Sequence, residues 1–188
     1  MSSGLVYLIG AGPGDPGLLT IRAQKVLQEA DVVIYDRLVG EEILAMASPE
    51  AELIYVGKAA GRHSLPQEEI NKLLVKKAQE GKKVARLKGG DPFLFGRGGE
   101  EAVFLREHGL DFEVIPGITS AIAVPAYAGI PVTHRDITSS FAVITGHEKP
   151  EKAMSSIQWD KISTGVGTLV FLMGVENLPA ICHELVNN

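Results

Sequence analysis

Short apolar runs alternate with amphipathic stretches along the first 115 residues, and this alternation restricts the possible folds more than any other feature. The runs are rich in valine, leucine and isoleucine and predict strands at 5–9, 32–35, 53–56, 84–87 and 112–115. The stretches between them predict helices at 20–30, 41–47, 64–79 and 99–108. Continuous apolar strands joined by helices are typical of a parallel sheet covered on both faces, so we expect an α/β fold.

Pro116 and Gly117 interrupt the alternation and predict a domain boundary, with an N-terminal α/β domain at 1–116 and a second α/β domain at 117–188. The second domain is predicted to contain a helix, two strands and a final helix at 119–127, 141–145, 169–173 and the end of the chain. The polar stretch between its strands shows no clear pattern. Because this unit is small for an α/β layer and finishes on a helix, we expect it to be incomplete.

Composition and residue counts argue against several classes of function. The net charge of −5 argues weakly against a nucleic-acid partner. The longest nearly apolar stretch, 118–132, is too short to span a membrane. Cys182 is the single cysteine, which fits a reducing cytoplasm. The five histidines have neither i,i+4 pairing nor cysteine partners, so no metal site is expected. The cations of the region 76–88, Arg86 and Lys88 included, are predicted to be solvated.

A glycine-rich loop follows the fourth predicted strand and contains five glycines between positions 89 and 99. Glycine costs conformational entropy and adds nothing to a core, so such a loop is expected where backbone comes close to a ligand. In it, Asp91 can accept hydrogen bonds from a ligand and Arg97 can hold a carboxylate in a fork. The alternative is a flexible surface turn, against which Pro92 and two phenylalanines argue.

Other loops also follow predicted strands. The loop 10–15 stands where nucleotide-binding proteins carry a glycine loop, but Asp15 replaces the third glycine and Pro13 lacks an N–H. This argues against an NAD-dependent oxidoreductase. Asp36 and Lys58 lie at the carboxyl ends of strands, where parallel sheets bind ligands. The alternatives are an Asp36 that caps a helix or pairs with Arg37, and a solvated Lys58.

Together these segments resemble the tetrapyrrole methylase family. The resemblance follows the family's order over nearly the whole chain and is carried by 6–20, 35–39, 56–58, 88–101, 116–121, 129–135, 145–147 and 171–174. It implies a two-domain tetrapyrrole methylase fold with S-adenosylmethionine bound between the domains. Members of this family are normally homodimers, so the resemblance also implies a homodimer. The present chain would then hold a complete first domain and a truncated second one.

The resemblance also implies roles for individual residues. By motif match, Asp36 is the proton acceptor and Lys58 the proton donor. The implied cofactor contacts are Pro13, Gly89, Gly90, Asp91, Leu94, Thr119, Ser120 and Met173. Gly89 and Gly90 would then lie against the methionine end of the cofactor, where a Cβ would collide.

The family members that methylate uroporphyrinogen III match best, which implies a cytoplasmic enzyme that transfers two methyl groups to ring carbons and gives precorrin-2 for sirohaem and cobalamin. The many carboxylates of that substrate would give Arg62, Arg97 and Arg135 a purpose as orienting cations. No nucleic-acid or membrane partner is expected. Two alternatives stay open: a precorrin methyltransferase acting later in corrin synthesis, and an inactive fragment of the enzyme.

Overall fold

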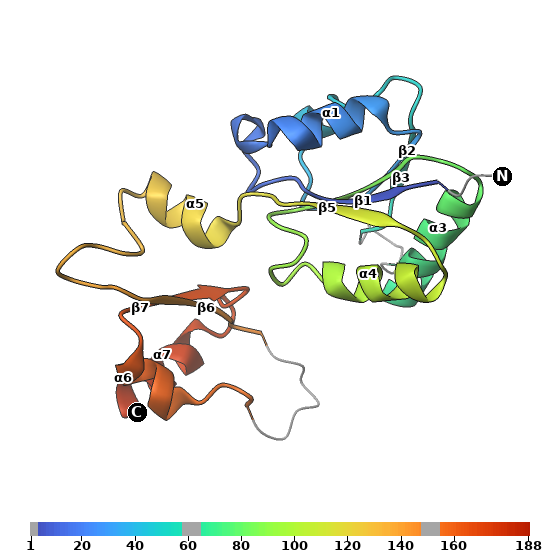
Figure 1. Ribbon diagram of the computed structural model, residues 1–188. Helices are drawn as coiled ribbons and strands as arrows, with labels where there is room; N and C mark the ends of the chain where they lie inside the picture. Colours follow the sequence, from blue (N-terminus) through green and yellow to red (C-terminus); the bar gives the residue numbers. More distant parts are fainter. Residues whose placement is uncertain (1–3, 58–64, 148–154) are drawn as a thin grey trace. The chain divides into compact units, whose positions relative to one another are not determined.

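The computed structural model describes residues 4–57, 65–147 and 155–188 (Figure 1). The chain divides into two compact units, Met1–Thr119 and Ser120–Asn188. Among the described residues, no helix combines the length and the apolar character needed to cross a membrane.

A five-stranded parallel sheet forms the centre of the first unit, with the strand order β3-β2-β4-β1-β5. In the pairing register, Val6 of β1 and Val32 of β2 both lie opposite Val84 of β4. The strands are β1 (Val6–Gly10), β2 (Val32–Tyr35), β3 (Glu52–Tyr55), β4 (Val84–Lys88) and β5 (Phe112–Ile115). The predicted α/β class with a parallel sheet is therefore confirmed.

Helices cover both faces of this sheet (Figure 1). On one face α1 (Ile21–Glu29) and the short α2 (Glu41–Leu44) pack on Ile9, Val33 and Leu87. On the other, α3 (Gln67–Gln79) and α4 (Gly98–Glu107) pack on Leu8, Ile34 and Val84. Successive strand residues point to opposite faces, so two covered faces require the continuous apolar runs seen in the sequence.

Two local features shape the connection after β1. Asp15 caps the single-turn 3₁₀ helix Pro16–Leu18, where its Oδ1 accepts the N–H of Gly17 at 2.7 Å. Thr20 caps α1, where its hydroxyl accepts the N–H of Ala23 at 3.2 Å. Both caps satisfy N–H groups that a helix start leaves without partners, and they fix where the loop 10–15 ends.

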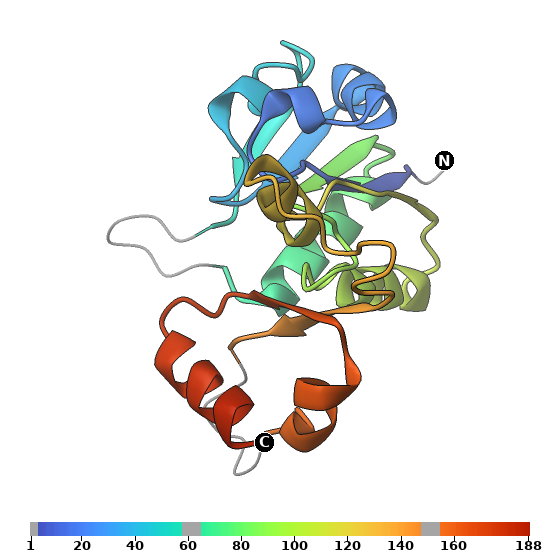
Figure 2. The same cartoon turned by 90° about the vertical axis from the view of Figure 1, so that its left-hand side faces the viewer.

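The second unit is built on two parallel strands, β6 (Phe141–Thr145) and β7 (Thr168–Leu172). Figures 1 and 2 show two helices on one side of this pair, α6 (Trp159–Gly165) and α7 (Leu178–Asn187), while α5 (Ser120–Tyr127) contacts β7. The sequence did not predict α6, which lies in the polar stretch. Apolar periodicity fails there because α6 has no buried residue, and its Trp159 ring instead stacks on Phe171 at 5.9 Å.

Candidate functional site

The predicted site loops of the first unit leave the carboxyl ends of parallel strands, which meet at one edge of the sheet. Gly12 and Gly90 are joined there by two backbone hydrogen bonds. The Gly90 N–H donates to the Gly12 carbonyl at 2.7 Å, and the Gly12 N–H donates to the Gly90 carbonyl at 3.1 Å. This bridge places the loop that carries Pro13 beside the glycine-rich loop.

Asp91 joins the glycine-rich loop to the segment after β5. Its Oδ1 accepts the N–H groups of Phe93 at 2.8 Å and Leu94 at 3.1 Å, and its Oδ2 accepts the N–H of Gly117 at 3.0 Å. The carboxylate thus already has three backbone donors, and its main structural task is to hold the loop. Contact of Asp91 or Leu94 with a cofactor stays a prediction.

Several glycines of this loop are required by packing within the protein. A Cβ on Gly96 or Gly98 would collide with the carbonyl oxygen of Pro92, so these two have a packing reason and the expectation that ligand approach alone explains the glycines is wrong. A Cβ on Gly89 would lie 2.6 Å from the Cβ of Leu38. Protein, not ligand, therefore excludes a side chain there as well.

Gly90 differs from the other glycines of the loop. Among the glycines of this loop it alone has a left-handed φ, +66°, and of the described residues only the Cα of Thr119 would lie near a Cβ there, at 3.9 Å. The space beside Gly90 is thus open, and it is bordered by Thr119, a second predicted cofactor contact. This fits the prediction that a ligand lies against the Gly90 backbone.

Backbone strain coincides with the predicted site segments. Among the described residues, the non-glycine residues with positive φ are Phe95 (53°), Arg97 (58°), Asp136 (69°) and Met173 (58°). The left-handed conformation costs an L-residue about 1–2 kcal/mol, and such strain gathers at functional sites. Arg97 and Met173 were predicted site residues, Phe95 lies in the same loop as Arg97, and Asp136 follows the predicted Arg135.

Arg97 already has a carboxylate partner. Its Nε donates to Glu100 Oε1 at 2.8 Å and its Nη2 to Glu100 Oε2 at 2.7 Å, and this pair raises the pKa of the guanidinium. Both side chains are exposed. A substrate carboxylate would have to replace Glu100 or bind other N–H groups of the guanidinium, and the predicted substrate role of Arg97 stays a prediction.

Asp36 follows β2 at the same edge of the sheet. Its Oδ1 accepts the N–H of Leu38 at 3.1 Å, and its Oδ2 lies 3.5 Å from Nη2 of Arg86. The ion-pair partner is thus Arg86 on the neighbouring strand β4, whereas the sequence alternative named Arg37. The Asp36 side chain is 28% exposed, so one end of this ion pair is open to solvent.

A buried charge cluster that the sequence did not predict lies beneath this edge. Arg86, Lys88 and Glu101 have side chains only 3%, 5% and 0% exposed, so the prediction that Arg86 and Lys88 are solvated is wrong. They are buried because β4 lies between β2 and β1 and α4 covers this face. Burial, and then the charge of Arg86, lower the pKa of Lys88, against the opposite pull of Glu101. The sequence did contain a signal for this cluster, because Arg86 and Lys88 occupy alternating positions of one strand and therefore share a face.

The second unit carries the remaining described candidates. Ser120 opens α5, and Met173 directly follows β7 and is exposed. Arg135 lies in a turn closed by two backbone hydrogen bonds of 3.0 Å between His134 and Thr138.

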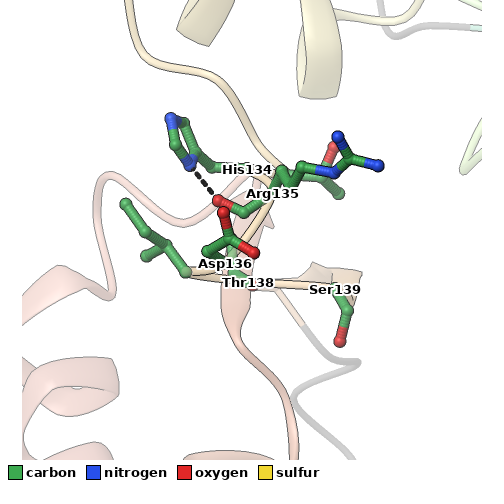
Figure 3. A pocket seen from close by; sticks show the side chains of 7 residues that line it. His134, Arg135, Asp136, Thr138 and Ser139 are labelled. Atoms are coloured by element: carbon green, nitrogen blue, oxygen red, sulfur yellow. Dashed lines mark hydrogen bonds between the residues drawn. The ribbon is translucent and has the colours of Figure 1, made fainter.

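Figure 3 shows the side chains of Arg135 and His134 extending in different directions from this turn, which lines a hollow of about 580 Å³. Lys58 and Arg62 lie outside the described residues. Within the part of the chain that the structure describes, no group of three or more His, Cys, Asp or Glu side chains could hold a metal ion.

Known proteins that are similar to this chain include uroporphyrinogen-III C-methyltransferases from different organisms. The chain is 57% identical to a uroporphyrinogen-III C-methyltransferase of Bacillus subtilis over 187 residues, which is 100% of this chain and 39% of the relative. It is 58% identical to one of Methanocaldococcus jannaschii over 186 residues, 99% of this chain and 76% of the relative. The chain thus spans well under half of one relative and about three-quarters of the other.

A solved structure shares this fold. The crystal structure of uroporphyrin-III C-methyl transferase from Thermus thermophilus complexed with S-adenosyl homocysteine is 45% identical, with a TM-score of 0.79 over 98% of this chain and 72% of that one. The family model described as Tetrapyrrole (Corrin/Porphyrin) Methylases matches residues 5–188. The chain belongs to the tetrapyrrole methylase family.

Proposed function

We propose that this chain carries an S-adenosylmethionine-dependent C-methyltransferase activity that converts uroporphyrinogen III to precorrin-2. The observation that carries the proposal is the meeting of three predicted site segments in the first unit. Gly12 is bridged to Gly90, Thr119 borders Gly90, and Asp91 binds the N–H of Gly117. Relatives with the same activity in their names support it.

The residues present fit S-adenosylmethionine, which supplies, when bound, a methyl group activated by a sulfonium. The open, left-handed backbone at Gly90 accommodates a ligand that a side chain would displace. The other proposed cofactor contacts are Pro13, Asp91, Leu94, Thr119, Ser120 and Met173. Gly89, whose lack of a side chain is already explained by Leu38, would contact the cofactor through its backbone.

Asp36 would serve as the proton acceptor in this reaction. Methylation of a ring carbon leaves a proton to be lost as conjugation shifts, and a partly exposed carboxylate at the ligand edge of the sheet can take it. Lys58 would serve as the proton donor. Arg62, Arg97 and Arg135 would orient the substrate through its carboxylates, and the strained backbone at Arg97 and next to Arg135 accords with that role.

The proposal includes a homodimer in the cytoplasm. Cys182 is exposed and unpaired, which suits a reducing compartment. Sedimentation of the purified protein tests the dimer.

The activity is tested by incubating the purified protein with uroporphyrinogen III and S-adenosylmethionine. Precorrin-2 is followed by its absorbance and S-adenosylhomocysteine binding by calorimetry. Formation of precorrin-2 supports the proposal. Binding without turnover of uroporphyrinogen III, but with turnover of a methylated precorrin, would replace the proposed substrate with a later one.

A further inference from the structure

A buried charge network lies under the ligand edge of the sheet, on the face covered by α3 and α4. Arg86 and Lys88 are two residues apart on β4, so both point to that face. Glu101 of α4 meets them there, and its side chain is fully buried. Arg86 lies opposite Leu8 of β1 and Ile34 of β2, so the central strand carries a cation where its neighbours carry aliphatic side chains.

One carboxylate oxygen of Glu101 accepts hydrogen bonds from three side chains. Its Oε1 accepts hydrogen bonds from Lys88 Nζ at 2.9 Å, Arg86 Nε at 3.0 Å and Gln67 Nε2 at 3.1 Å. Its Oε2 is buried without a hydrogen-bond partner among the described residues. Buried ion pairs recover little of their desolvation cost, and apolar residues of similar volume often serve stability equally well. Stability alone therefore explains this network poorly.

Arg86 carries the network to the edge of the sheet. Its Nη1 donates to the carbonyl oxygens of Leu87 at 3.2 Å and Ile34 at 3.3 Å, and its Nη2 faces Asp36 Oδ2 at 3.5 Å. The guanidinium is thus anchored by Glu101 at one end and pairs with Asp36 at the other. Since the Leu38 N–H holds the second oxygen of Asp36, both oxygens of this carboxylate have fixed partners.

We propose that Glu101 is a positioning residue for the reaction: through Arg86 it holds the Asp36 carboxylate in place at the ligand edge of the sheet. The proposal rests on the proposed function, in which Asp36 accepts the proton. Without the Glu101 charge, Arg86 and Lys88 repel each other and the Nε of Arg86 loses its anionic partner. The guanidinium then moves, and Asp36 moves with it. A small displacement of a catalytic group lowers turnover far more than ligand binding.

A double-mutant cycle tests the coupling. Glu101→Gln should lower kcat about ten-fold while KM for S-adenosylmethionine changes less than about two-fold. Asp36→Asn should lower kcat about a hundred-fold. If Glu101 acts through Asp36, the double variant should be no slower than Asp36→Asn within about two-fold, because coupled effects are not additive.

Glu107→Gln is the matched control, because Glu107 is an exposed carboxylate at the end of the same helix. It should leave kcat unchanged. An unchanged kcat in Glu101→Gln, or single effects that multiply in the double variant, would overturn the positioning role.

Circular dichroism of each variant monitors folding. Should Glu101→Gln fail to fold, Arg86→Lys replaces it in the same cycle, since lysine keeps the charge but lacks the fork that reaches both carboxylates. The outcomes stated for Glu101→Gln then support or overturn the positioning role in the same way. Failure of the proposed function is seen separately, as an unaltered kcat in Asp36→Asn alone.

Discussion

Gly10 and Gly117 pack backbone against backbone: a Cβ on Gly117 would lie 2.6 Å from the Cα of Gly10. The same Cβ would also collide with the carbonyl oxygen of Gly90. Three loops that leave different strands therefore meet at a point where only glycine fits. The loop 10–15 thus has a packing reason for its first glycine.

Gly117→Ala should destabilise the first unit by about 1–3 kcal/mol, the usual cost of overpacking, because neither neighbouring backbone can withdraw cheaply. Urea denaturation measures the loss. Gly99→Ala is the control, since a Cβ there meets no described residue within 4 Å and Gly99 lies in α4. That change should raise stability by up to about 1 kcal/mol. Equal stabilities of the two variants would contradict the close approach at Gly117.

Gly90→Ala should weaken S-adenosylhomocysteine binding at least about ten-fold, because a methyl group occupying the open space beside Thr119 costs one or more contacts of the ligand. The left-handed φ also makes alanine strained, at about 1–2 kcal/mol. Gly109→Ala separates the two effects, since Gly109 has nearly the same φ, +68° against +66°, and lies in the turn between α4 and β5.

Both variants should lose similar stability in thermal melts, and only Gly90→Ala should lose affinity in calorimetry. Normal affinity of Gly90→Ala would remove the ligand from this loop.

Asp36→Asn should retain affinity for S-adenosylhomocysteine and lower turnover about a hundred-fold, as expected of a lost general base. The amide is nearly isosteric and can still accept the Leu38 N–H, so the loop should keep its shape. Asp31→Asn is a control at the opposite end of the same strand, where the Asp31 carboxylate accepts the N–H of Lys83. Turnover measured for both variants distinguishes them, and equal turnover would reduce Asp36 to a structural partner of Arg86.

Much of the first unit could be predicted because its strands are continuous apolar runs and its helices bury one face. The partners of charged groups could not. Glu100 and Glu101 are neighbours in sequence, yet one pairs with the exposed Arg97 and the other is fully buried beneath β4. Which of the two faces the sheet depends on the packing of α4, which a local pattern does not specify.

The glycine-rich loop also has features that the sequence could not predict. Its glycines indicated a special backbone, but the reason for Gly96 and Gly98 lies in the path of the folded loop, where a Cβ at either position would collide with Pro92. The sequence likewise did not indicate that Asp91 caps its own loop through Phe93 and Leu94.

The lowered pKa of Lys88 predicts a pH-dependent contribution to stability. Between this lowered pKa and the ordinary value of 10.5, the unfolded chain holds a proton that the folded chain has released, so folding becomes more favourable as the pH rises. Wild type should therefore gain stability relative to Lys88→Met as the pH is raised toward 10.5. Lys77 offers the opposite case, because its pKa is raised by the Glu52 carboxylate at 2.6 Å.

Stabilisation by Lys77 is complete below 10.5 and is lost as the pH rises above that value through the raised pKa. Relative to Lys77→Met, wild type should therefore hold its advantage up to 10.5 and then lose it. Urea denaturation of the three proteins across the alkaline range measures both differences. If the advantage of wild type over Lys88→Met instead stays constant up to 10.5 and falls above that value, as expected for Lys77, the pull of Glu101 outweighs burial and Arg86, and Lys88 is held charged.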